Sequence, residues 1–401
     1  MLNLEVPKKL KPLVEQATQV ANFVFRPISR KYDLAEHAYP KELDLLAAAM
    51  DGMNSAGGVG AGAGELSRKQ TGDAGVKNGA NMATVLGLTE LCWGDVGLAL
   101  SIPRQGLGNS AIAAVATPEQ KAKFNGTWAA MAITEPGAGS DSGAIRTTAV
   151  RDGDEWVLNG EKIFVTAGER CDSVVVWATL DASLGRAAIK SFIVPKGTPG
   201  MQVLRLEHKL GIRASDTATI AFTDCRIPFE NILGSPEIDT QKSFAGVMQT
   251  FDNTRPVVAG MAIGVARAAL ELTRDILKQE GIKQTYRGSI WSRSAAEAEL
   301  CRMEAEWEAA RLLTLRAAWM ADNGIPNSMQ ASMAKAKAGR MATDVTLRCV
   351  ELCGGAGYSE TELLEKWARD SKILDIFEGT QQIQMLVVAR RLLNKKSSEL
   401  R

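Results

Sequence analysis

Residues 155–166 read EWVLNGEKIFVT, and the organisation of the whole chain follows from this segment. Apolar and polar residues alternate on both sides of Asn159-Gly160. Asn-Gly supplies the positive φ angles of a two-residue hairpin turn. The pattern therefore predicts a β-hairpin that turns at Asn159-Gly160.

More strand-like runs follow this segment, at residues 173–180, 191–194, 201–206 and 217–222. No helical pattern separates them. Successive hairpins favour an antiparallel barrel or sandwich over a parallel sheet.

The segments on either side have the periodicity of helices. Helices are predicted over residues 41–53 and 80–100, and again from about residue 237 onward. Breaks at 323–326 and 353–357 divide the last part into about four long helices. We therefore predict an α+β fold with three domains: an N-terminal α-helical domain (1–125), a middle antiparallel β-barrel domain (126–236) and a C-terminal four-helix bundle (237–401).

Composition excludes several classes of function. Of 401 residues, 47 are Lys or Arg and 46 are Asp or Glu, so there is no electrostatic case for a nucleic-acid-binding protein. The two histidines, His37 and His208, are far apart in sequence, so we expect no metal site. The six cysteines form neither a metal-binding nor a disulfide pattern, which indicates a reducing compartment, and we expect a cytoplasmic protein.

Two further segments allow more than one interpretation. The N-terminus has no apolar run long enough for a signal peptide or a membrane span, and an amphipathic helix there could pack on the protein or lie on a membrane surface. The glycine-rich run at residues 57–64 resembles a dinucleotide fingerprint. That fingerprint needs a preceding strand, and the preceding segment here is helical, so a loop is the better interpretation.

The candidate catalytic residue is Glu378, within DIFEGTQQIQ at residues 375–384. Apolar neighbours precede it, and a glycine and hydrogen-bonding residues follow it at the start of a helical pattern. An apolar environment raises the pKa of a carboxyl group, which suits a general base near neutral pH. The alternative is a carboxylate that stabilises the helix macrodipole.

Two more motifs accompany this stretch: MAITEPGAGSD at residues 131–141 and FDNTRPVVA at 251–259. All three, in this order and around a β segment of suitable size, resemble the acyl-CoA dehydrogenase family over nearly the whole chain. The resemblance implies a flavoprotein oxidoreductase of lipid metabolism with FAD as its cofactor.

The resemblance also implies a set of FAD-binding residues. Thr134 offers a hydroxyl group, and Gly139 lets the main chain come close to the cofactor. The implied residues are Met131, Ile133, Thr134, Gly139, Ser140, Phe164, Thr166, Gly354, Gly355, Thr380 and Gln382. Two alternatives remain: the glycine-rich part of the first motif could be an exposed turn, and Phe164 could be an ordinary barrel residue.

The implied substrate is an acyl-CoA thioester, bound by Ser140, Asp252, Arg255 and Gly379. Arg255 can donate a fork of hydrogen bonds, or it could form a surface ion pair. Some family members carry the base at a position matching Thr254 or its neighbour. Since Asp252 is the only acidic residue nearby, Glu378 keeps that assignment.

The implied reaction is α,β-desaturation to a trans-2-enoyl-CoA, as in fatty acid β-oxidation. Glu378 removes the α-proton, a hydride passes from the β-carbon to flavin N5, and an electron-transfer flavoprotein accepts the electrons. The alternative is an acyl-CoA oxidase that uses O2. A non-enzymatic relative that binds nucleic acid is disfavoured by the charge balance and by the retained Glu378.

Two departures from the family pattern occur together. The segment 279–289 is lengthened and does not show the usual pattern of an arginine and a phenylalanine that family members direct toward a neighbouring subunit's FAD, although Arg287 or Tyr286 could substitute. Glu351 stands where glutamine is usual. A homotetramer or homodimer is one expectation. The other is a heterotetramer in which a related chain supplies the missing contacts and the FAD site is shared.

Overall fold

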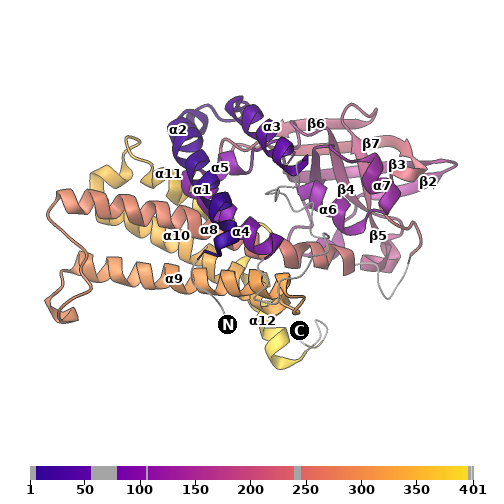
Figure 1. The fold of residues 1–401 in the computed structure, drawn as a ribbon. Coiled ribbons are helices and arrows are strands. Elements are labelled where there is room, and N and C mark those ends of the chain that lie inside the picture. The colour runs from indigo at the N-terminus through magenta and orange to yellow at the C-terminus, as the bar shows by residue number, and fades with distance from the viewer. Residues whose placement is uncertain (1–5, 56–78, 105–106, 239–244, 396–398, 400–401) are drawn as a thin grey trace.

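The computed structural model describes residues 6–55, 79–104, 107–238, 245–395 and 399, without the side chains of 49–55, 245–253 and 290. The strands gather at one end of the molecule and the long helices α8, α9 and α10 lie side by side at the other, with the N-terminal helices alongside them (Figure 1). The glycine-rich run at 57–64 lies outside the described residues.

Seven helices form the N-terminal part: α1 (Lys11–Val20), α2 (Arg26–Leu34), α3 (Glu42–Ser55), α4 (Ala80–Gly94), α5 (Val96–Ala99), α6 (Leu107–Val115) and α7 (Pro118–Lys123). The helix predicted at 41–53 is confirmed by α3. The helix predicted at 80–100 is split by Asp95, whose extended backbone ends α4 and whose Oδ1 accepts the Leu98 N–H at 2.8 Å to start α5. Between α1 and α2 the Phe25 side chain is fully buried, which supports the packed interpretation of the N-terminal helix.

The middle part is one curled sheet of seven strands: β1 (Ala129–Ala132), β2 (Thr148–Asp152), β3 (Glu155–Thr166), β4 (Ser173–Thr179), β5 (Ile189–Pro195), β6 (Met201–Leu206) and β7 (Thr217–Pro228). The strand order is β1-β4-β2-β3-β7-β6, and β5 pairs with β4. Most pairs are antiparallel as predicted, but β1 and β2 each run parallel to β4.

The predicted hairpin at Asn159-Gly160 is wrong. Residues 155–166 form the single strand β3, and the hairpin turn lies earlier, at Gly153, between β2 and β3. Gly160 has φ +152° and lies at a register shift between β3 and β7. Its positive φ therefore belongs to a β-bulge in β3 and not to a hairpin turn. A side chain there would clash, since a Cβ on Gly160 would lie 2.4 Å from Thr147 Oγ1.

The C-terminal part contains α8 (Ala245–Gln279), α9 (Ala295–Asp322), α10 (Ser328–Tyr358), α11 (Leu364–Ser371) and α12 (Gln381–Leu393). Three of these are long, fewer than the four predicted, and α11 and α12 are short. Both predicted breaks occur: 323–326 separates α9 from α10, and Gly354 kinks the end of α10 with φ +53°.

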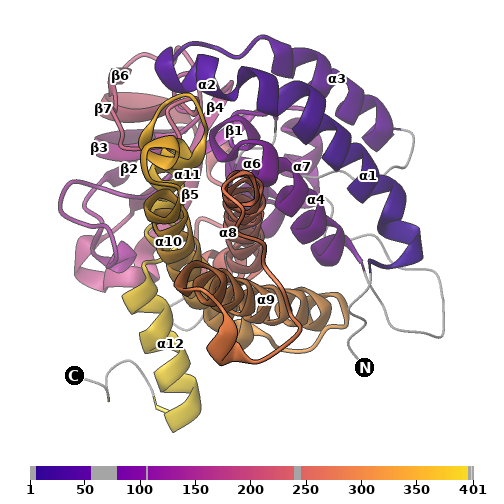
Figure 2. The same ribbon diagram turned by 90° about the vertical axis from the view of Figure 1, so that its left-hand side faces the viewer.

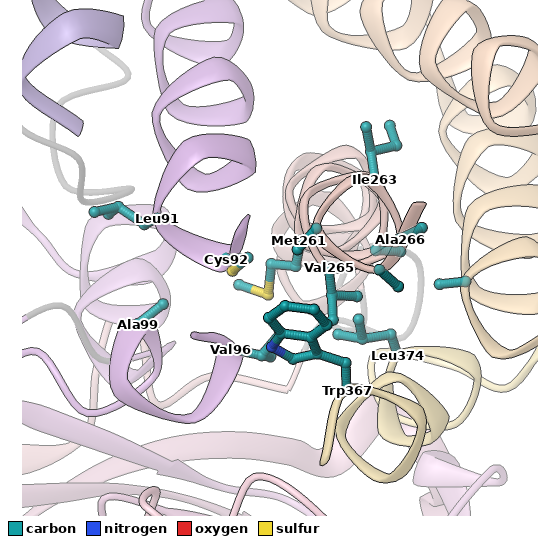
Figure 3. Close-up of a cluster of buried hydrophobic side chains, with 14 of the residues drawn as sticks. Leu91, Cys92, Val96, Ala99, Met261, Ile263, Val265, Ala266, Trp367 and Leu374 are labelled. Atoms are coloured by element: carbon teal, nitrogen blue, oxygen red, sulfur yellow. The ribbon is translucent and has the colours of Figure 1, made fainter. Parts of the chain in front are cut away.

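Helix α8 is the centre of the core. It contacts α4, α9 and α10, which surround it when the bundle is seen end-on (Figure 2). Figure 3 shows its Met261, Val265 and Ala266 beside Trp367 and Leu374, all buried. By length and composition residues 254–279 could also cross a membrane, but most of this segment is buried inside the protein, as in the core helix of a soluble protein.

The two histidines lie together despite their separation in sequence. The ring centroids of His37, after α2, and His208, after β6, are 5.1 Å apart. Separation along the chain was therefore a wrong reason to exclude a shared histidine site.

Candidate active site

Glu378 lies in a strained turn just before α12. The φ angles of Glu378 and Gly379 are +55° and +89°. This left-handed conformation costs a residue with a side chain roughly 1–2 kcal/mol, so its surroundings must hold it. Thr380 caps the helix, since its Oγ1 accepts the Ile383 N–H at 3.3 Å. Glu378 is thus not the capping residue, although it still lies next to the N-terminus of α12.

Two buried side chains hold the turn from different helices. Gln384 Nε2, on α12, donates hydrogen bonds to the carbonyl oxygens of Glu378 at 3.1 Å and Gly379 at 3.2 Å. Lys335 Nζ, on α10, donates to the same Gly379 oxygen at 2.6 Å. These bonds replace water at carbonyl groups that the turn would otherwise leave without a partner.

The Glu378 carboxylate points toward α8. Its Oε2 accepts a hydrogen bond from Thr254 Oγ1 at 2.6 Å. Burial raises the pKa of Glu378, while the Thr254 hydroxyl and the charges of Arg255 and Lys335 oppose that rise. A carboxylate with a raised pKa, held by one hydroxyl, has the properties of a general base that works near neutral pH.

Arg255 is buried, with 4% of its surface exposed, so the surface ion-pair interpretation is wrong. Its Nη1 lies 3.5 Å from Ser332 Oγ on α10, and its charge acts on Glu378. Asp252 belongs to α8, but its side chain lies outside the described part of the chain, so its predicted role stays a prediction. The structure thus brings Glu378, Gly379 and Arg255 together.

Lys335 is a buried cation next to the candidate base. Burial lowers the pKa of Lys335 to about 8, although the charges of Asp375 and Glu378 act in the opposite direction. Asp375 is itself engaged by Lys372 at 3.1 Å and by Arg340 at 3.4 Å. The charge of Lys335 therefore acts on both Asp375 and Glu378, while its hydrogen bond goes to the turn that carries Glu378.

The first motif is fastened to β3 by a buried ion pair. Glu135 Oε1 lies 2.7 Å from Lys162 Nζ, and both side chains are at least nine-tenths buried. The Glu135 carboxylate also accepts the N–H groups of Arg146 at 2.6 Å and Thr147 at 2.9 Å. Burial lowers the pKa of Lys162 to about 8, with Glu135 acting against that shift. This pair sets the path of the loop that follows β1.

The same loop is open where the cofactor residues were predicted. Thr134 O accepts the Ile163 N–H at 2.9 Å, which places Thr134 beside the β3 segment that carries Phe164. Phe164 has φ +56° and is 59% exposed, so it is not an ordinary barrel residue. Gly139 and Ser140 are exposed, and a Cβ on Gly139 would meet no atom within 4 Å. The glycine-rich part of the motif is therefore exposed at Gly139 and Ser140, while Glu135 and Ala138 are buried.

The other predicted cofactor residues lie in three places. Thr380 and Gln382 belong to the start of α12, next to Glu378, and Met131, Ile133 and Thr166 lie at the ends of β1 and β3. Gly354 and Gly355 lie elsewhere, on the exposed end of α10. With a rise of 1.5 Å per residue, Gly354 is roughly 28 Å along the helix from Lys335.

Comparison with known proteins agrees with these observations. Residues 130–225 match the acyl-CoA dehydrogenase middle domain and residues 244–393 match the acyl-CoA dehydrogenase C-terminal domain. The short-chain-specific acyl-CoA dehydrogenase of Clostridium acetobutylicum is 37% identical over 317 residues, which cover 76% of this chain and 80% of that protein. The chain belongs to the acyl-CoA dehydrogenase family.

Other members of the family extend the comparison. The mitochondrial short-chain-specific enzyme of Rattus norvegicus is 40% identical over 267 residues, 67% of this chain, and the match spans 63% of that relative's length. The structure of butyryl-CoA dehydrogenase from Megasphaera elsdenii has a TM-score of 0.80 and 29% identity, covering 98% of this chain and all of the other. The acyl-CoA dehydrogenase fold is therefore confirmed, while the boundaries at 125/126 and 236/237 stay predictions.

The two departures from the acyl-CoA dehydrogenase pattern are both at the exposed end of the bundle. Glu351 pairs with Arg348, which also donates to Glu299 at 3.0 Å, so its charge is partly compensated. Tyr286, in the segment 279–289, is 68% exposed and its hydroxyl bonds to Glu304.

Sequence reasoning missed three residues that shape this candidate site: Lys335, Gln384 and the Glu135 partner Lys162. A signal existed for Lys335, since it interrupts the small buried residues Ala331, Ala334 and Ala338 on one face of α10. A lysine on such a face must be paired with an acceptor. The acceptor itself, a carbonyl 44 residues away, could not be found from sequence.

Proposed function

We propose that this chain is an FAD-dependent acyl-CoA dehydrogenase that desaturates the α,β bond of an acyl-CoA thioester. The observation that carries the proposal is the Glu378 carboxylate, held by Thr254 at 2.6 Å in a strained turn, with a pKa raised by burial. Such a group can take the α-proton of a bound thioester. The family membership of the chain supports the same reaction.

The described residues fit FAD as the cofactor. Phe164 offers an exposed apolar ring, and no atom lies within 4 Å of a Cβ built on Gly137 or Gly139. Thr134, Thr166 and Ser140 supply hydroxyl groups around this open surface, and Thr380 and Gln382 add polar groups from α12. When bound, FAD supplies the two-electron oxidation by accepting the β-hydrogen of the substrate.

The protein's own groups perform the remaining steps. Glu378 removes the proton, and its raised pKa brings it closer to the pH at which it works. The backbone N–H of Glu378 lies in a turn fixed by Gln384 and Lys335, and a fixed donor stabilises an enolate oxygen without reorganisation. Arg255 and Gly379 border the place where the thioester would lie.

The electron acceptor and the subunit arrangement belong to the proposal. An electron-transfer flavoprotein is the expected acceptor; a chain from a structure titled "Electron transferring flavoprotein of Acidaminococcus fermentans" is 31% identical with a TM-score of 0.80. Gly354 and Gly355 are too far along α10 to act with Glu378 of the same chain. Their distance from Glu378 supports a role for Gly354 and Gly355 in binding the FAD of another subunit. The assembly would be a homotetramer, a homodimer or a heterotetramer with a related chain.

The test is the flavin content of the purified chain, followed by anaerobic bleaching with acyl-CoAs from butyryl-CoA upward. About one flavin per chain and bleaching by one of these thioesters would support the proposal. Failure of a flavin-loaded protein to bleach with any of them would contradict it. Rapid peroxide formation in air would instead indicate an oxidase, and low flavin that a partner chain restores would indicate the shared site.

A further inference from the structure

A second cluster of functional side chains lies away from Glu378, where the N-terminal helices meet the sheet. Both histidines of the chain contribute to it: His37 from the loop between α2 and α3, and His208 from the segment between β6 and β7. Glu36 is the third member. The potential ligand atoms of the three residues all lie within 4.8 Å of one another.

His37 lacks the hydrogen bonds that a buried imidazole normally makes. Its Nδ1 and Nε2 are both buried and have no hydrogen-bond partner among the residues that the structure describes. Its backbone is held firmly, with φ +69° and its carbonyl oxygen 3.3 Å from Arg170 Nη2. Buried polar atoms without partners cost free energy, so a ligand at this ring would offset a cost already present.

The side chains of His208 and Glu36 lie next to each other, beside the ring of His37. His208 Nδ1 is 2.8 Å from Glu36 Oε2, and the His208 side chain is 83% exposed, which gives an ion access from solvent. Glu36 Oε1 accepts the Lys209 N–H at 3.0 Å, which fixes the carboxylate. A hydrogen bond to the second atom of a ligand group is the usual support of a metal ligand.

We infer that Glu36, His37 and His208 form a binding site for a divalent transition-metal ion of the zinc type. Two imidazoles and one carboxylate are a common zinc ligand set, with water in the fourth position. Bonds of about 2.0–2.1 Å place tetrahedral ligand atoms roughly 3.4 Å apart. Ligand atoms within 4.8 Å therefore reach this geometry through side-chain movements of about 1 Å.

The surrounding charges select against hard cations. Magnesium and calcium need several carboxylate or carbonyl oxygens, and this cluster has one carboxylate. The nearby cations Arg170 and Lys209 make the site less favourable for ions bound by charge alone. Both are engaged elsewhere, Arg170 with Asp216 at 3.4 Å and Lys209 with Ser215 O at 2.8 Å. Neutral imidazole ligands bind zinc, nickel or copper under these conditions.

A bound ion would join two parts of the fold. The segment after His208 is already fastened to α11, since Ile212 N–H donates to Asp370 Oδ1 at 2.5 Å and Leu210 O accepts from Arg369 at 3.1 Å. An ion on His37 would add the loop between α2 and α3 to this attachment. Metal binding is therefore expected to raise the midpoint of thermal unfolding, because the three ligands come together only in the folded chain.

The test uses tag-free full-length protein, treated with a chelator, desalted and titrated with Zn²⁺, Co²⁺ or Mg²⁺ by calorimetry. We expect about one Zn²⁺ per chain, a visible Co²⁺ spectrum of tetrahedral type and no Mg²⁺ binding. His208→Ala, at an exposed position, is expected to fold normally and to weaken Zn²⁺ binding at least about 100-fold, the upper end of what loss of a supporting partner costs. Glu360→Gln, an exposed acid elsewhere, is the matched control.

Thermal unfolding gives an independent readout. Zn²⁺ should raise the unfolding midpoint of the wild type and the Glu360→Gln control, but not that of His208→Ala or Glu36→Gln. Zn²⁺ binding of equal strength in His208→Ala would overturn the proposal, because the ion would then be held elsewhere, for example by cysteines. Absence of Zn²⁺ binding to the wild type would also overturn it. Flavin content and activity do not enter either readout.

Discussion

Replacing Lys335 by methionine tests how a buried cation positions the base. Lys335 is 1% exposed, and its Nζ donates to Gly379 O at 2.6 Å. Methionine keeps most of the volume but removes the charge and the hydrogen bond. A hydrogen bond from a charged group contributes roughly 1.5–3 kcal/mol, and Gln384 at 3.2 Å would still hold the same oxygen. If this loss appears in the transition state, kcat falls about 10- to 100-fold.

The same substitution changes the pH profile. The charge of Lys335 lowers the pKa of Glu378, so its removal raises that pKa further. A base is inactive below its pKa, so the acidic limb of kcat/KM moves to higher pH, and part of the lost rate returns as the pH increases. The free energy of unfolding should change little. Burial disfavours the charge of Lys335, as its pKa of about 8 indicates, so removing that charge offsets the loss of its hydrogen bond to Gly379 O.

The assay is steady-state kinetics from pH 5.5 to 9 with flavin content measured on each preparation. Lys337→Met is the matched control, since Lys337 lies two residues away on α10, is about one-third exposed and pairs with Glu306. The control should retain kcat and its pH profile. An unshifted acidic limb in Lys335→Met, or an equal loss in both variants, would refute the reasoning.

Three further substitutions probe the site and the core. Thr254→Val removes the hydroxyl donor at 2.6 Å from Glu378, so the pKa of Glu378 rises and kcat/KM falls at pH 6 more than at pH 8. The control Thr254→Ser keeps a hydroxyl and should preserve kcat/KM at both pH values. A loss of equal size at both pH values would contradict this role of Thr254. Lys366→Met leaves the buried carboxylates of Asp95 and Asp370 without their cation, and urea unfolding should show a loss of about 3–5 kcal/mol. The control Lys31→Met, at an exposed ion pair, should leave the stability nearly unchanged. Glu135→Gln leaves the buried Lys162 ammonium without its carboxylate and loosens the loop after β1, so the flavin content should drop and the free energy of unfolding should fall by roughly 3 kcal/mol. The control Asp141→Asn, which breaks an exposed ion pair with Arg186, should change neither the flavin content nor the stability.

Much of the fold could be predicted because its signals are local. The strands at 173–180, 191–194, 201–206 and 217–222 all occur, since short runs rich in apolar and β-branched residues, without a helical pattern between them, favour strands. The hairpin at Asn159-Gly160 failed for a physical reason. A positive φ at glycine suits a bulge as well as a turn, and the choice depends on β7, more than 50 residues away, where Asp224 bonds to the Asn159 side chain.

The site was predictable only in part. Glu378 and the residues of the first motif could be found because they occur as contiguous motifs. Lys335 and Gln384 could not, because their role is to bond to backbone carbonyls in a turn whose shape the sequence does not reveal. The pairing of His37 with His208 likewise depends on how the N-terminal helices dock on the sheet.

The central claim is that Glu378 is the base that removes the α-proton. The most direct test is the rate of anaerobic flavin bleaching by an acyl-CoA in the wild type and in Glu378→Gln, with flavin content measured in both. A glutamine cannot accept the proton, and a positioned base contributes about 10²–10⁴-fold, so the variant should retain its flavin and bleach slower by that factor. A flavin-loaded Glu378→Gln protein that bleaches at the wild-type rate would contradict the account.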